Sequence, residues 1–311
     1  MKFYLVPILA TAIPLFANAY IQFMVNLMLV YVLVTVGFNL VLGNLGQLAF
    51  ANTALFGIGA YAAAMLMAHA GWPFWAVIVP AGLAGAAAGF LASVSALRGI
   101  RVYYLAIITL AFGELLRWLY IHGERATGGT DGLAVPQSSF FGVALDSETA
   151  RFYVFLVIVT LVVKGISNLM HSRIGRAIVA IRDNELATAS LAIPTGRTIV
   201  LAFVLSGFVV GVGGAMFALL IGRVIPESFG LIELILHFAM VLVGGFGSLL
   251  GSVLGAVALT ALPEYFRGFP GLYEMFFGAL VIVFLLVQPR GLSALVARWW
   301  PALRDRYYRE G

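Results

Sequence analysis

The amino-acid sequence predicts an all-α, polytopic membrane protein in which residues 1–311 form a single permease-like domain of about ten transmembrane helices. Hydrophobic residues make up 62% of the 311 residues and charged residues only 10%, and the mean hydropathy is +1.05. Too few polar residues remain to cover a water-soluble protein of 33.3 kDa, so most side chains are expected to face lipid or one another. Recurring apolar runs and the placement of basic residues point to the same class.

Ten apolar runs approach the ~20 residues that a helix needs to cross the hydrocarbon core. They span residues 3–19, 21–42, 54–68, 72–97, 102–121, 152–170, 199–222, 231–246, 251–262 and 272–287. Runs 54–68 and 251–262 are short and follow Gly-rich bends, so either could be a tilted or broken element. Run 3–19 also has the pattern of a signal peptide, but the next span begins at once, so we expect an uncleaved first helix.

Basic residues indicate the orientation, because loops rich in Lys and Arg stay on the cytoplasmic side of a membrane. With the N-terminus inside, few basic residues fall on the outer side. These are Arg117, Arg125, Arg151, Arg223 and Arg267. The other Lys and Arg residues then lie inside, which predicts that both termini are cytoplasmic. The net charge of +5 follows from this asymmetry and requires no nucleic-acid partner.

Missing residue types exclude several classes of function. The chain contains no cysteine, which excludes disulfides and thiolate metal sites. It has no G-x-x-x-x-G-K-[ST] motif and its only lysines are Lys2 and Lys164, so any ATPase must be a separate chain. The histidines form no H-E-x-x-H pattern. We therefore expect no catalytic residue, no metal site and no cofactor.

The segment SRIGRAIVAIRDNELATASLAI, which begins at Ser172, is unusually polar for this chain. It falls within residues 172–198, the longest loop expected on the cytoplasmic side. Apolar residues recur there at helical spacing, at Ile174, Ala177, Ile178, Ile181, Leu186 and Ala189. This pattern predicts a short amphipathic helix or two. Such a helix either rests on lipid headgroups, with its arginines toward phosphate, or docks onto a soluble partner.

Uncharged amides follow the second span and the bend after it. They are Asn39, Asn44, Gln47 and Asn52. These side chains could line a water-filled translocation path. Alternatively, they form hydrogen bonds between helices, which is the common use of Asn and Gln in membrane bundles. The sequence leaves both interpretations open.

Few carboxylates lie within the predicted spans. Glu114 is followed by Arg117 three residues later, and Glu233 by His237 four residues later, so both carboxylates are expected to be paired on their own helices. Carriers driven by protons or sodium keep ionisable groups near the middle of the membrane, which is the alternative role for these two residues.

Three glycines, Gly247, Gly251 and Gly255, are spaced four residues apart. On a helix this spacing places bare backbone on one face, where a neighbouring helix can approach closely. We expect a packing seam, which could lie at the contact with another permease subunit. The overlapping segment GGFGSL at 244–249 is similar to GNLGQL at 43–48, which suggests an internal duplication.

Blocks along nearly the whole chain resemble permeases of branched-chain amino acid ABC importers of the LivH/LivM type, and LivM more closely. They are GNLGQLAFANTALFGIGAYAA at 43–63, YYLAIITLAFGELLRW at 103–118, TGGTDGL at 127–133, RAIVAIRDNELA at 176–187, LAFVLSGFVVGVGGAMFAL at 201–219, VLVGGFGSLLGSVLGA at 241–256 and QPRGL at 288–292. The blocks occur in the family's order, which makes the resemblance more specific than one match would be.

The resemblance implies a permease subunit in the lipid of the bacterial inner membrane. It implies three kinds of protein partner: a homologous LivH-like permease, cytoplasmic ABC ATPase subunits and a periplasmic substrate-binding protein that delivers branched-chain amino acids. The family also includes permeases for urea and short-chain amides, so that cargo remains an alternative. A passive small-solute channel is a further alternative, although such a pore would not need the polar loop 172–198.

The resemblance also assigns roles to particular residues. In the loop, the ATPase-coupling candidates are Arg176, Ile178, Arg182, Asp183, Asn184 and Glu185. On the outer side, the candidates for docking the binding protein are Arg125, Arg151, Arg223 and Arg267, whose alternative role is to anchor helix ends at headgroups. The chain departs from the family at Ala192, where glycine is usual, and at Pro194, so the exit from the coupling segment is expected to differ in detail.

Overall fold

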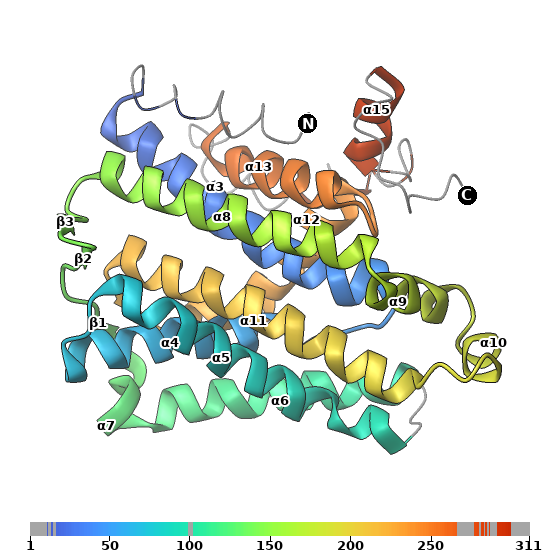
Figure 1. Ribbon diagram of the computed structural model, residues 1–311. Helices are drawn as coiled ribbons and strands as arrows, with labels where there is room; N and C mark the ends of the chain where they lie inside the picture. The colour runs from blue at the N-terminus through green and yellow to red at the C-terminus, as the bar shows by residue number, and fades with distance from the viewer. Residues whose placement is uncertain are drawn as a thin grey trace.

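The computed structural model describes residues 17–98, 102–265 and 291–299, together with positions 11, 14, 277–279, 281, 282, 284 and 286. In these parts of the chain the protein is a bundle of long helices (Figure 1). The mostly helical class that composition predicts is therefore confirmed, and the strands among the described residues are two residues long each.

Six described helices are long and apolar enough to cross a membrane. They are α3 (Ala19–Asn39) with its π-helical continuation η2 (Leu40–Asn44), α4 (Asn52–Ala70), α5 (Phe74–Ser93) with the 3₁₀ turn η3 (Val94–Arg98), α6 (Val102–His122), α8 (Glu148–His171) and α11 (Thr195–Ile221). Each overlaps one of the predicted runs over nearly its whole length. The run 54–68 forms a full-length helix of 19 residues, because α4 extends beyond the apolar run at both ends.

Two shorter apolar helices and one terminal helix complete the described part. They are α12 (Leu231–Gly244), of 14 residues, α13 (Leu249–Tyr265), of 17 residues, and α15 (Gly291–Trp299). The predicted runs 3–19 and 272–287 are described only in part, by separate short stretches. The described part therefore does not establish the expected number of spans.

Short elements gather at two opposite ends of the bundle (Figure 1). One end, called here the strand end, carries α7 (Glu124–Thr127), η4 (Gly129–Asp131), β1 (Leu133–Ala134), β2 (Ser139–Phe140), β3 (Val143–Ala144), β4 (Arg223–Val224) and η5 (Pro226–Phe229). The other end carries the α9–α10 corner, formed by α9 (Arg173–Asp183) and α10 (Glu185–Ser190). The polar segments predicted on opposite sides of a membrane thus lie at opposite ends of the bundle.

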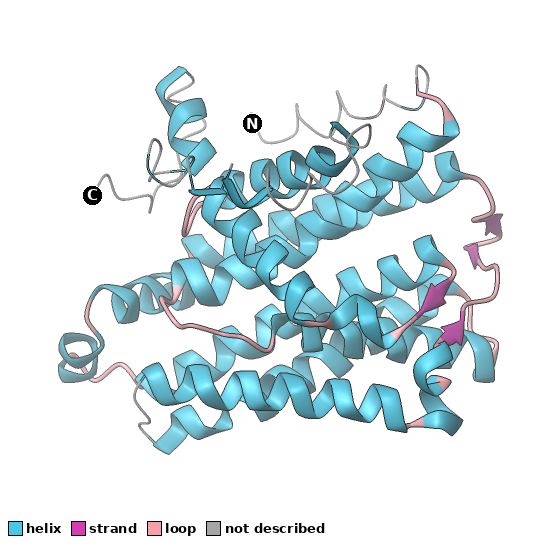
Figure 2. Ribbon diagram, turned by 180° about the vertical axis from the view of Figure 1, so that it is seen from behind, coloured by secondary structure: helices cyan, strands magenta, loops and turns pink. Residues whose placement is uncertain are grey.

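Two small antiparallel ribbons organise the strand end, and both lie on the same side of the molecule in Figure 2. Strand β1 pairs with β4, with Leu133 opposite Val224, and β2 pairs with β3 in a hairpin. The β1–β4 pair ties the chain that follows α6 to the chain that follows α11. This ribbon holds two long helices together where they leave the apolar region.

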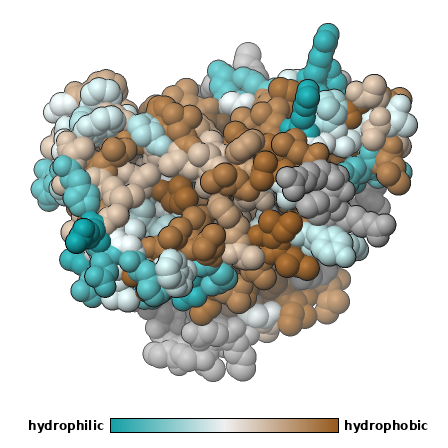
Figure 3. All heavy atoms as spheres, turned by 90° about the horizontal axis from the view of Figure 1, so that it is seen from below, coloured by the Kyte–Doolittle hydropathy of each residue, from teal (hydrophilic) through white to brown (hydrophobic). Residues whose placement is uncertain are grey.

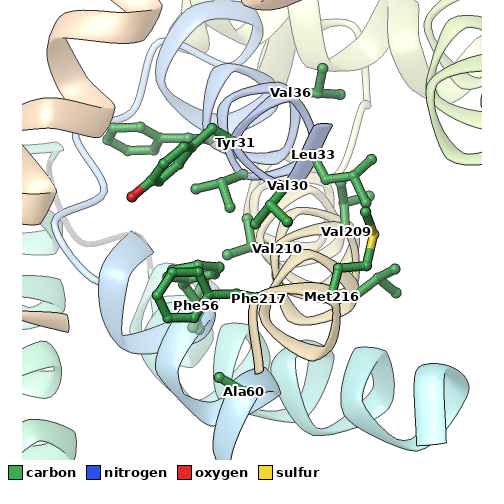
Figure 4. Packing of buried hydrophobic residues seen from close by; sticks show 14 of the residues in the cluster. Val30, Tyr31, Leu33, Val36, Phe56, Ala60, Val209, Val210, Met216 and Phe217 are labelled. Carbon is green, nitrogen blue, oxygen red and sulfur yellow. The ribbon is translucent and has the colours of Figure 1, made fainter. Parts of the chain in front are cut away.

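Helix α11 lies in the interior of the bundle, with 78% of its most apolar window buried, compared with 28% for α6. Figure 4 shows Val209 and Met216 of α11 in the cluster with Leu33 of α3 and Phe56 of α4. The exposed side chains of α6 are largely apolar or aromatic, as expected of a surface that faces lipid. In Figure 3 the central part of this face is mostly hydrophobic, and hydrophilic residues gather toward its edges.

Small residues allow α11 to approach its neighbours closely. Gly211 lies against the backbone of Gly59 in α4, and Gly207 lies against the backbone of Gly85 in α5. A Cβ added at any of these four positions would overlap backbone atoms of a neighbouring helix, which for Gly211 is α5. At the points where the central helices cross, glycines leave no side chain between them, so the two backbones can touch.

The predicted glycine seam lies partly within this chain. Gly251 and Gly255 of α13 face the backbone of α12 around Gly244. Gly247 does not share their helix face, because α13 begins at Leu249 and Gly247 lies in the preceding turn with a φ of +73°. A left-handed residue cannot continue an α-helix, and this is why the four-residue spacing misplaces Gly247.

Candidate translocation path and coupling corner

Helix α3 carries polar side chains at four-residue spacing, and this set, Tyr31, Thr35 and Asn39, is called here the polar ladder. All three residues are buried, and all three contact the segment that contains α12 and the start of α13. Lipid offers no hydrogen-bond partners, so polar groups in a membrane bundle must find theirs within protein. The ladder therefore holds together two helices whose contacting residues are 202 or more positions apart.

At the first position of the ladder, Tyr31 belongs to a cluster of four polar side chains. Its hydroxyl donates a hydrogen bond to Oε1 of Glu233 at 2.6 Å, and Nε2 of His237 lies 3.4 Å from the same oxygen. Nδ2 of Asn52 lies 3.2 Å from Nδ1 of His237, which is 0% exposed. The rings of Tyr31 and Phe56 each stand edge-on to the imidazole. The cluster can therefore hold one carboxylate charge inside the bundle.

This geometry bears on two sequence expectations. Glu233 and His237 are paired on one helix, as their i,i+4 spacing predicts, and Glu114 and Arg117 of α6 approach to 3.7 Å in the same way. Asn52 belongs to the cluster at the start of α4, where its Oδ1 atom is buried without a partner among the described residues. Asn52 thus keeps a buried hydrogen-bonding atom that is unused among the described residues.

At the last position of the ladder, Asn39 bonds both sides of the turn before α13. Its Oδ1 accepts from the backbone N–H of Gly247 at 2.9 Å. Its Nδ2 donates to the carbonyl of Ser248 at 2.9 Å and to Oγ of Ser252 at 2.7 Å. One amide thereby satisfies three groups on the neighbouring segment. Asn39 forms the interhelical contact that was the alternative to path lining.

A cavity of about 40 Å³ lies beside this contact and is lined by Asn39, Asn44, His171 and Ser252 among others. By volume it holds about three water molecules. Asn44 lies in η2 and donates a hydrogen bond from Nδ2 to the carbonyl of Asn39 at 3.3 Å. Gln47 is buried in the segment between η2 and α4. The cavity is too small for an amino acid, so this conformation is closed at that point.

The α9–α10 corner contains two helices, as the sequence predicts, and each has a side-chain cap. Oγ of Ser172 accepts from the backbone N–H of Ile174 at 3.1 Å, and Oδ1 of Asn184 accepts from that of Ala187 at 2.9 Å. Asn184 is extended, with φ −164° and ψ 107°, so it separates α9 from α10. The apolar positions of the loop are therefore divided between two helices instead of sharing one continuous face.

The two helices of the corner use their apolar residues differently. Ile178 and Ile181 of α9 are buried within this chain. Leu186 of α10 and Leu191 just after it are 84% and 74% exposed. These two leucines are therefore available to contact another molecule or lipid headgroups. Leu191 was not among the sequence candidates, and its place after the helix, outside the helical spacing, explains why.

Charged residues surround these leucines. Arg176 donates from Nη1 to the carbonyl of His171 at 3.2 Å, which attaches the start of α9 to the end of α8. Arg182, Asp183 and Asn184 are exposed, and Glu185 is half-buried at the first position of α10. A carboxylate at a helix N-terminus is favoured by the helix dipole. Arg182, Asp183 and Glu185 therefore lie at the junction of the two helices, whereas Arg176 lies near the start of α9.

The departures at Ala192 and Pro194 have a structural consequence. Ala192 adopts a φ of +60°, the left-handed conformation that favours glycine, and Pro194 directly precedes α11. The chain thus keeps the backbone bend at Ala192 although its side chain disfavours that bend. The residues at this exit differ from those usual in the family. The backbone at Ala192 nevertheless adopts a conformation that favours glycine.

Three of the four outer-side arginines lie at the strand end. Arg125 is exposed in α7. Arg151 forms an ion pair with Glu148 at 2.7 Å and also bonds the carbonyl of Leu145 at 2.8 Å. Nη1 of Arg223 donates to the carbonyl of Asp131 at 2.9 Å. Arg267 lies outside the described residues. Arg125 is consequently the one of these three for which no contact to this chain is seen.

Sequence reasoning missed the partners of the ladder. Tyr31, Thr35, Ser248 and Ser252 were not candidates, although the spacing of Tyr31, Thr35 and Asn39 by four residues could have marked a polar face on the second span. Ser252 follows Ser248 by the same spacing on the opposing segment. Two matching polar faces are the signal that would have indicated the contact.

Comparison with known proteins places these features in a family. The family described as "Branched-chain amino acid transport system / permease component" matches residues 20–286. The LivM permease protein of the high-affinity branched-chain amino acid transport system of Escherichia coli (strain K12) is 33% identical, with 92% of this chain and 72% of LivM covered. The LivH permease protein of the same system and strain is 27% identical, with 84% and 90% covered.

A permease of a different import system also matches. The autoinducer 2 import system permease protein LsrC of Klebsiella pneumoniae is 29% identical, with 67% of this chain and 60% of LsrC covered. The family model spans most of the chain, and the LivM match exceeds 30% identity over more than two thirds of both proteins. The chain therefore belongs to the family of branched-chain amino acid transport system permease components.

Proposed function

We propose that this protein is the membrane-spanning permease subunit of an ATP-driven importer for branched-chain amino acids in a bacterial inner membrane. Family membership and the LivM relative support the transport role. The observation that carries the ATP-driven mechanism is the α9–α10 corner, where Leu186 and Leu191 are exposed among charged residues. A passive pore has no need of such a surface.

In this proposal the α9–α10 corner faces the cytoplasm and receives the movement of a separate ABC ATPase. Leu186 and Leu191 provide the apolar contact, and Asp183 and Glu185 fix its register through charged hydrogen bonds. Ile178 attaches the corner to this chain, since it is buried between the elements of the protein itself. Arg176 and Asn184 shape the corner through their bonds to His171 and Ala187.

The strand end then faces the periplasm and meets a substrate-binding protein. Arg125 is the leading candidate for this contact, because Arg151 and Arg223 are bonded to this chain. Arg267 remains a candidate from the sequence. Charges at the rim of an interface mainly set the rate and register of encounter, so these arginines would guide the binding protein without holding it tightly. A LivH-like permease is the proposed partner within the membrane, by analogy with the two relatives.

Substrate would pass along the face of α3 that carries the polar ladder. The amides Asn39, Asn44, Gln47 and Asn52 are buried near this face, and the first two border the small cavity. Because the cavity is closed, transport requires α3 and the turn before α13 to separate at Asn39. Neutral amides suit the passage of a zwitterionic amino acid, which carries no net charge.

Uptake by the assembled importer tests this proposal. The chain, its partner permease, the ATPase and the cognate binding protein are reconstituted in proteoliposomes, and uptake of radiolabelled leucine is measured with and without ATP. We expect uptake that requires both ATP and the binding protein. Uptake without ATP would support the channel alternative. A thermal-shift screen of the binding protein against amino acids, urea, amides and autoinducer 2 decides the cargo.

The orientation has its own test, which uses the absence of native cysteine. A cysteine introduced at Ser172 should react with an impermeant thiol reagent from the cytoplasmic side, and one at Asp131 from the outside. Labelling of the Ser172→Cys protein in intact cells would contradict the proposed orientation.

A further inference from the structure

The side chain of Arg182 crosses two glycines of its own chain. A Cβ added at Gly46 would lie 3.0 Å from Cγ of Arg182, and a Cβ added at Gly247 would lie 2.6 Å from its Nη1. The aliphatic stem of the arginine thus rests on one glycine, and its guanidinium rests on the other. Arg182 is at the end of α9, so this contact joins the α9–α10 corner to two turns inside the bundle.

The two glycines occupy equivalent positions in similar segments. Gly46 is the fourth residue of GNLGQL and Gly247 is the fourth residue of GGFGSL. Both are left-handed, with φ of +74° and +73°. Glycine is required at each position by the backbone conformation and also by the space that Arg182 occupies. The internal similarity noted in the sequence thus corresponds to two turns of like conformation that meet at one arginine.

These turns, residues 43–47 and 245–248, are called here the turn junction. Gly43 lies directly against the backbone N–H of Gly247, and a Cβ at Gly43 would overlap it. Asn39 then fastens the junction through its bonds to Gly247 and Ser248. The junction also borders the cavity, which is lined by Asn39, Asn44 and Gly247. A movement of the two turns would therefore change the opening of the path.

The guanidinium of Arg182 and two oxygen acceptors all lie around Gly247. A Cβ on Gly247 would be 2.6 Å from Nη1 of Arg182, 3.3 Å from the carbonyl oxygen of Gly43 and 3.5 Å from Oδ1 of Asn44. Among the described residues, no hydrogen bond from Arg182 is seen. A guanidinium offers five donors, so a small shift of α9 could form charged hydrogen bonds to these oxygens.

We propose that Arg182 is the positioning residue that transmits movement of the α9–α10 corner to the turn junction. In the closed state it lies across Gly46 and Gly247, and when α9 shifts it bonds Gly43 and Asn44 and moves both turns as one unit. This inference rests on the proposed function, in which an ATPase moves the corner. It assigns Arg182 to contacts within this chain, while Glu185 and the exposed leucines remain the contact with the ATPase.

The helix that carries Arg182 does not depend on it for attachment. Ile178 and Ile181 are buried, and Ser172 caps the start of α9. Removing the arginine should therefore leave the corner folded and able to bind an ATPase. A residue that merely interacted with solvent would also leave the corner folded, so transport must be measured together with assembly.

The test uses the cysteine-free chain in the complete importer. Arg182→Cys should retain the ATPase during purification but lose roughly ten-fold or more of ATP-driven uptake, a size typical of coupling between sites. Aminoethyl methanethiosulfonate adds a primary ammonium to the cysteine and should restore uptake several-fold, whereas the neutral methyl reagent should not. Arg173→Cys, on the same helix and exposed, is the matched control and should respond to neither reagent.

A double-mutant comparison adds a second readout. Gly46→Asn should reduce uptake in the native background, because its side chain displaces the stem of Arg182 while asparagine tolerates the left-handed backbone. In the Arg182→Ala background, the same substitution should cause a much smaller further loss. Equal losses in both backgrounds would show that Gly46 acts independently of Arg182 and would overturn the inference.

The remaining outcomes separate this inference from the proposed function. Full uptake by Arg182→Cys, or loss of the ATPase from the purified variant, would overturn the role of Arg182 while leaving the importer intact as a proposal. Absence of ATP-driven uptake by the wild-type complex would instead overturn the proposed function, and the role of Arg182 with it. Charge-specific rescue with retained ATPase is the result that supports the inference.

Discussion

Along α3, Tyr31, Thr35 and Asn39 are buried and each reaches a partner on the opposing segment, whereas in the α9–α10 corner Leu186 is exposed and Glu185 has no partner among the described residues. Both regions are polar interruptions of an apolar chain. The difference lies in their solvent. The ladder is inside the bundle, where an unpaired polar group is costly, and the corner is at an end, where water can satisfy charged groups.

The comparison separates two kinds of polar residue in this membrane protein. Residues of the first kind form hydrogen bonds within the protein and hold its helices in register. Residues of the second kind are left unsatisfied by their own chain and are available to another molecule. Substitutions in the ladder should therefore lower stability, and changes of charge or polarity at Glu185, Leu186 and Leu191 should lower transport while stability stays constant.

The largest effect is expected from Glu185→Lys in the corner. Reversing a charge in a contact that is desolvated on assembly commonly costs about 2–5 kcal/mol, because the opposing charge loses its partner. We expect normal insertion and an unchanged melting temperature of the isolated permease, but loss of ATP-driven uptake. Uptake and ATPase retention are measured in parallel with Glu185→Gln, which should be milder. Native uptake by the Lys variant would favour the lipid-headgroup interpretation of the corner.

The second effect is expected from Asn39→Leu in the ladder. This change leaves the N–H of Gly247 without its partner and removes two further hydrogen bonds, to the carbonyl of Ser248 and to Oγ of Ser252. A buried group left unsatisfied costs about 1–3 kcal/mol. The melting temperature of the purified protein in detergent should fall clearly. Thr160→Val is the control, because Thr160 bonds the carbonyl of Leu156 within its own helix, and its effect should be small. Similar melting temperatures for both variants would remove the structural role given to Asn39.

A smaller loss is expected from Tyr31→Phe at the other end of the ladder. The substitution removes the hydrogen bond to Glu233 but keeps the ring that packs on His237. A hydrogen bond to a charged group contributes about 1.5–3 kcal/mol, and His237 still faces the carboxylate, so the loss should be at the lower end. Thermal unfolding measures it. A double variant with Glu233→Gln should lose less than the sum of the single variants, because the two residues share one bond.

The smallest expected effect is a gain in stability, not a loss. Ala192 holds a φ of +60°, and a non-glycine residue in the left-handed region costs about 1 kcal/mol or more. Ala192→Gly should therefore raise the free energy of unfolding by about 0.5–1 kcal/mol. This net gain is smaller than the strain relieved, because glycine also gives the unfolded chain more conformational entropy. Ala189→Gly, three residues earlier in α10, should instead lower the free energy of unfolding, because glycine is unfavourable within a helix. The same sign for both variants would contradict the strain assigned to Ala192.

Much of the fold could be predicted because a bilayer sets the length of an apolar helix. Runs such as 152–170 and 199–222 needed no tertiary information, and the polar loop was recognised by contrast with them. The π-helical end of α3 and the break at Asn184 were not predicted. Both depend on backbone geometry that an apolar pattern does not encode.

The candidate site was predictable to a lesser degree, for a related reason. The amide Asn39 could be recognised as a buried polar residue, but its partners Gly247 and Ser248 lie more than 200 residues away. A single sequence does not specify such pairings. The spacing of Gly247 suggested a helix, and the left-handed turn became evident from the structure alone.

The exposed leucines of the α9–α10 corner provide the most direct test of the central claim, that this corner is reserved for a separate ATPase. Leu186 and Leu191 are together replaced by Asp in the complete importer, and the amount of ATPase that co-purifies with the permease is measured beside the permease melting temperature. The account predicts loss of most of the ATPase with an unchanged melting temperature, because both leucines are exposed and support nothing in their own chain. Native amounts of ATPase on the double variant would contradict it.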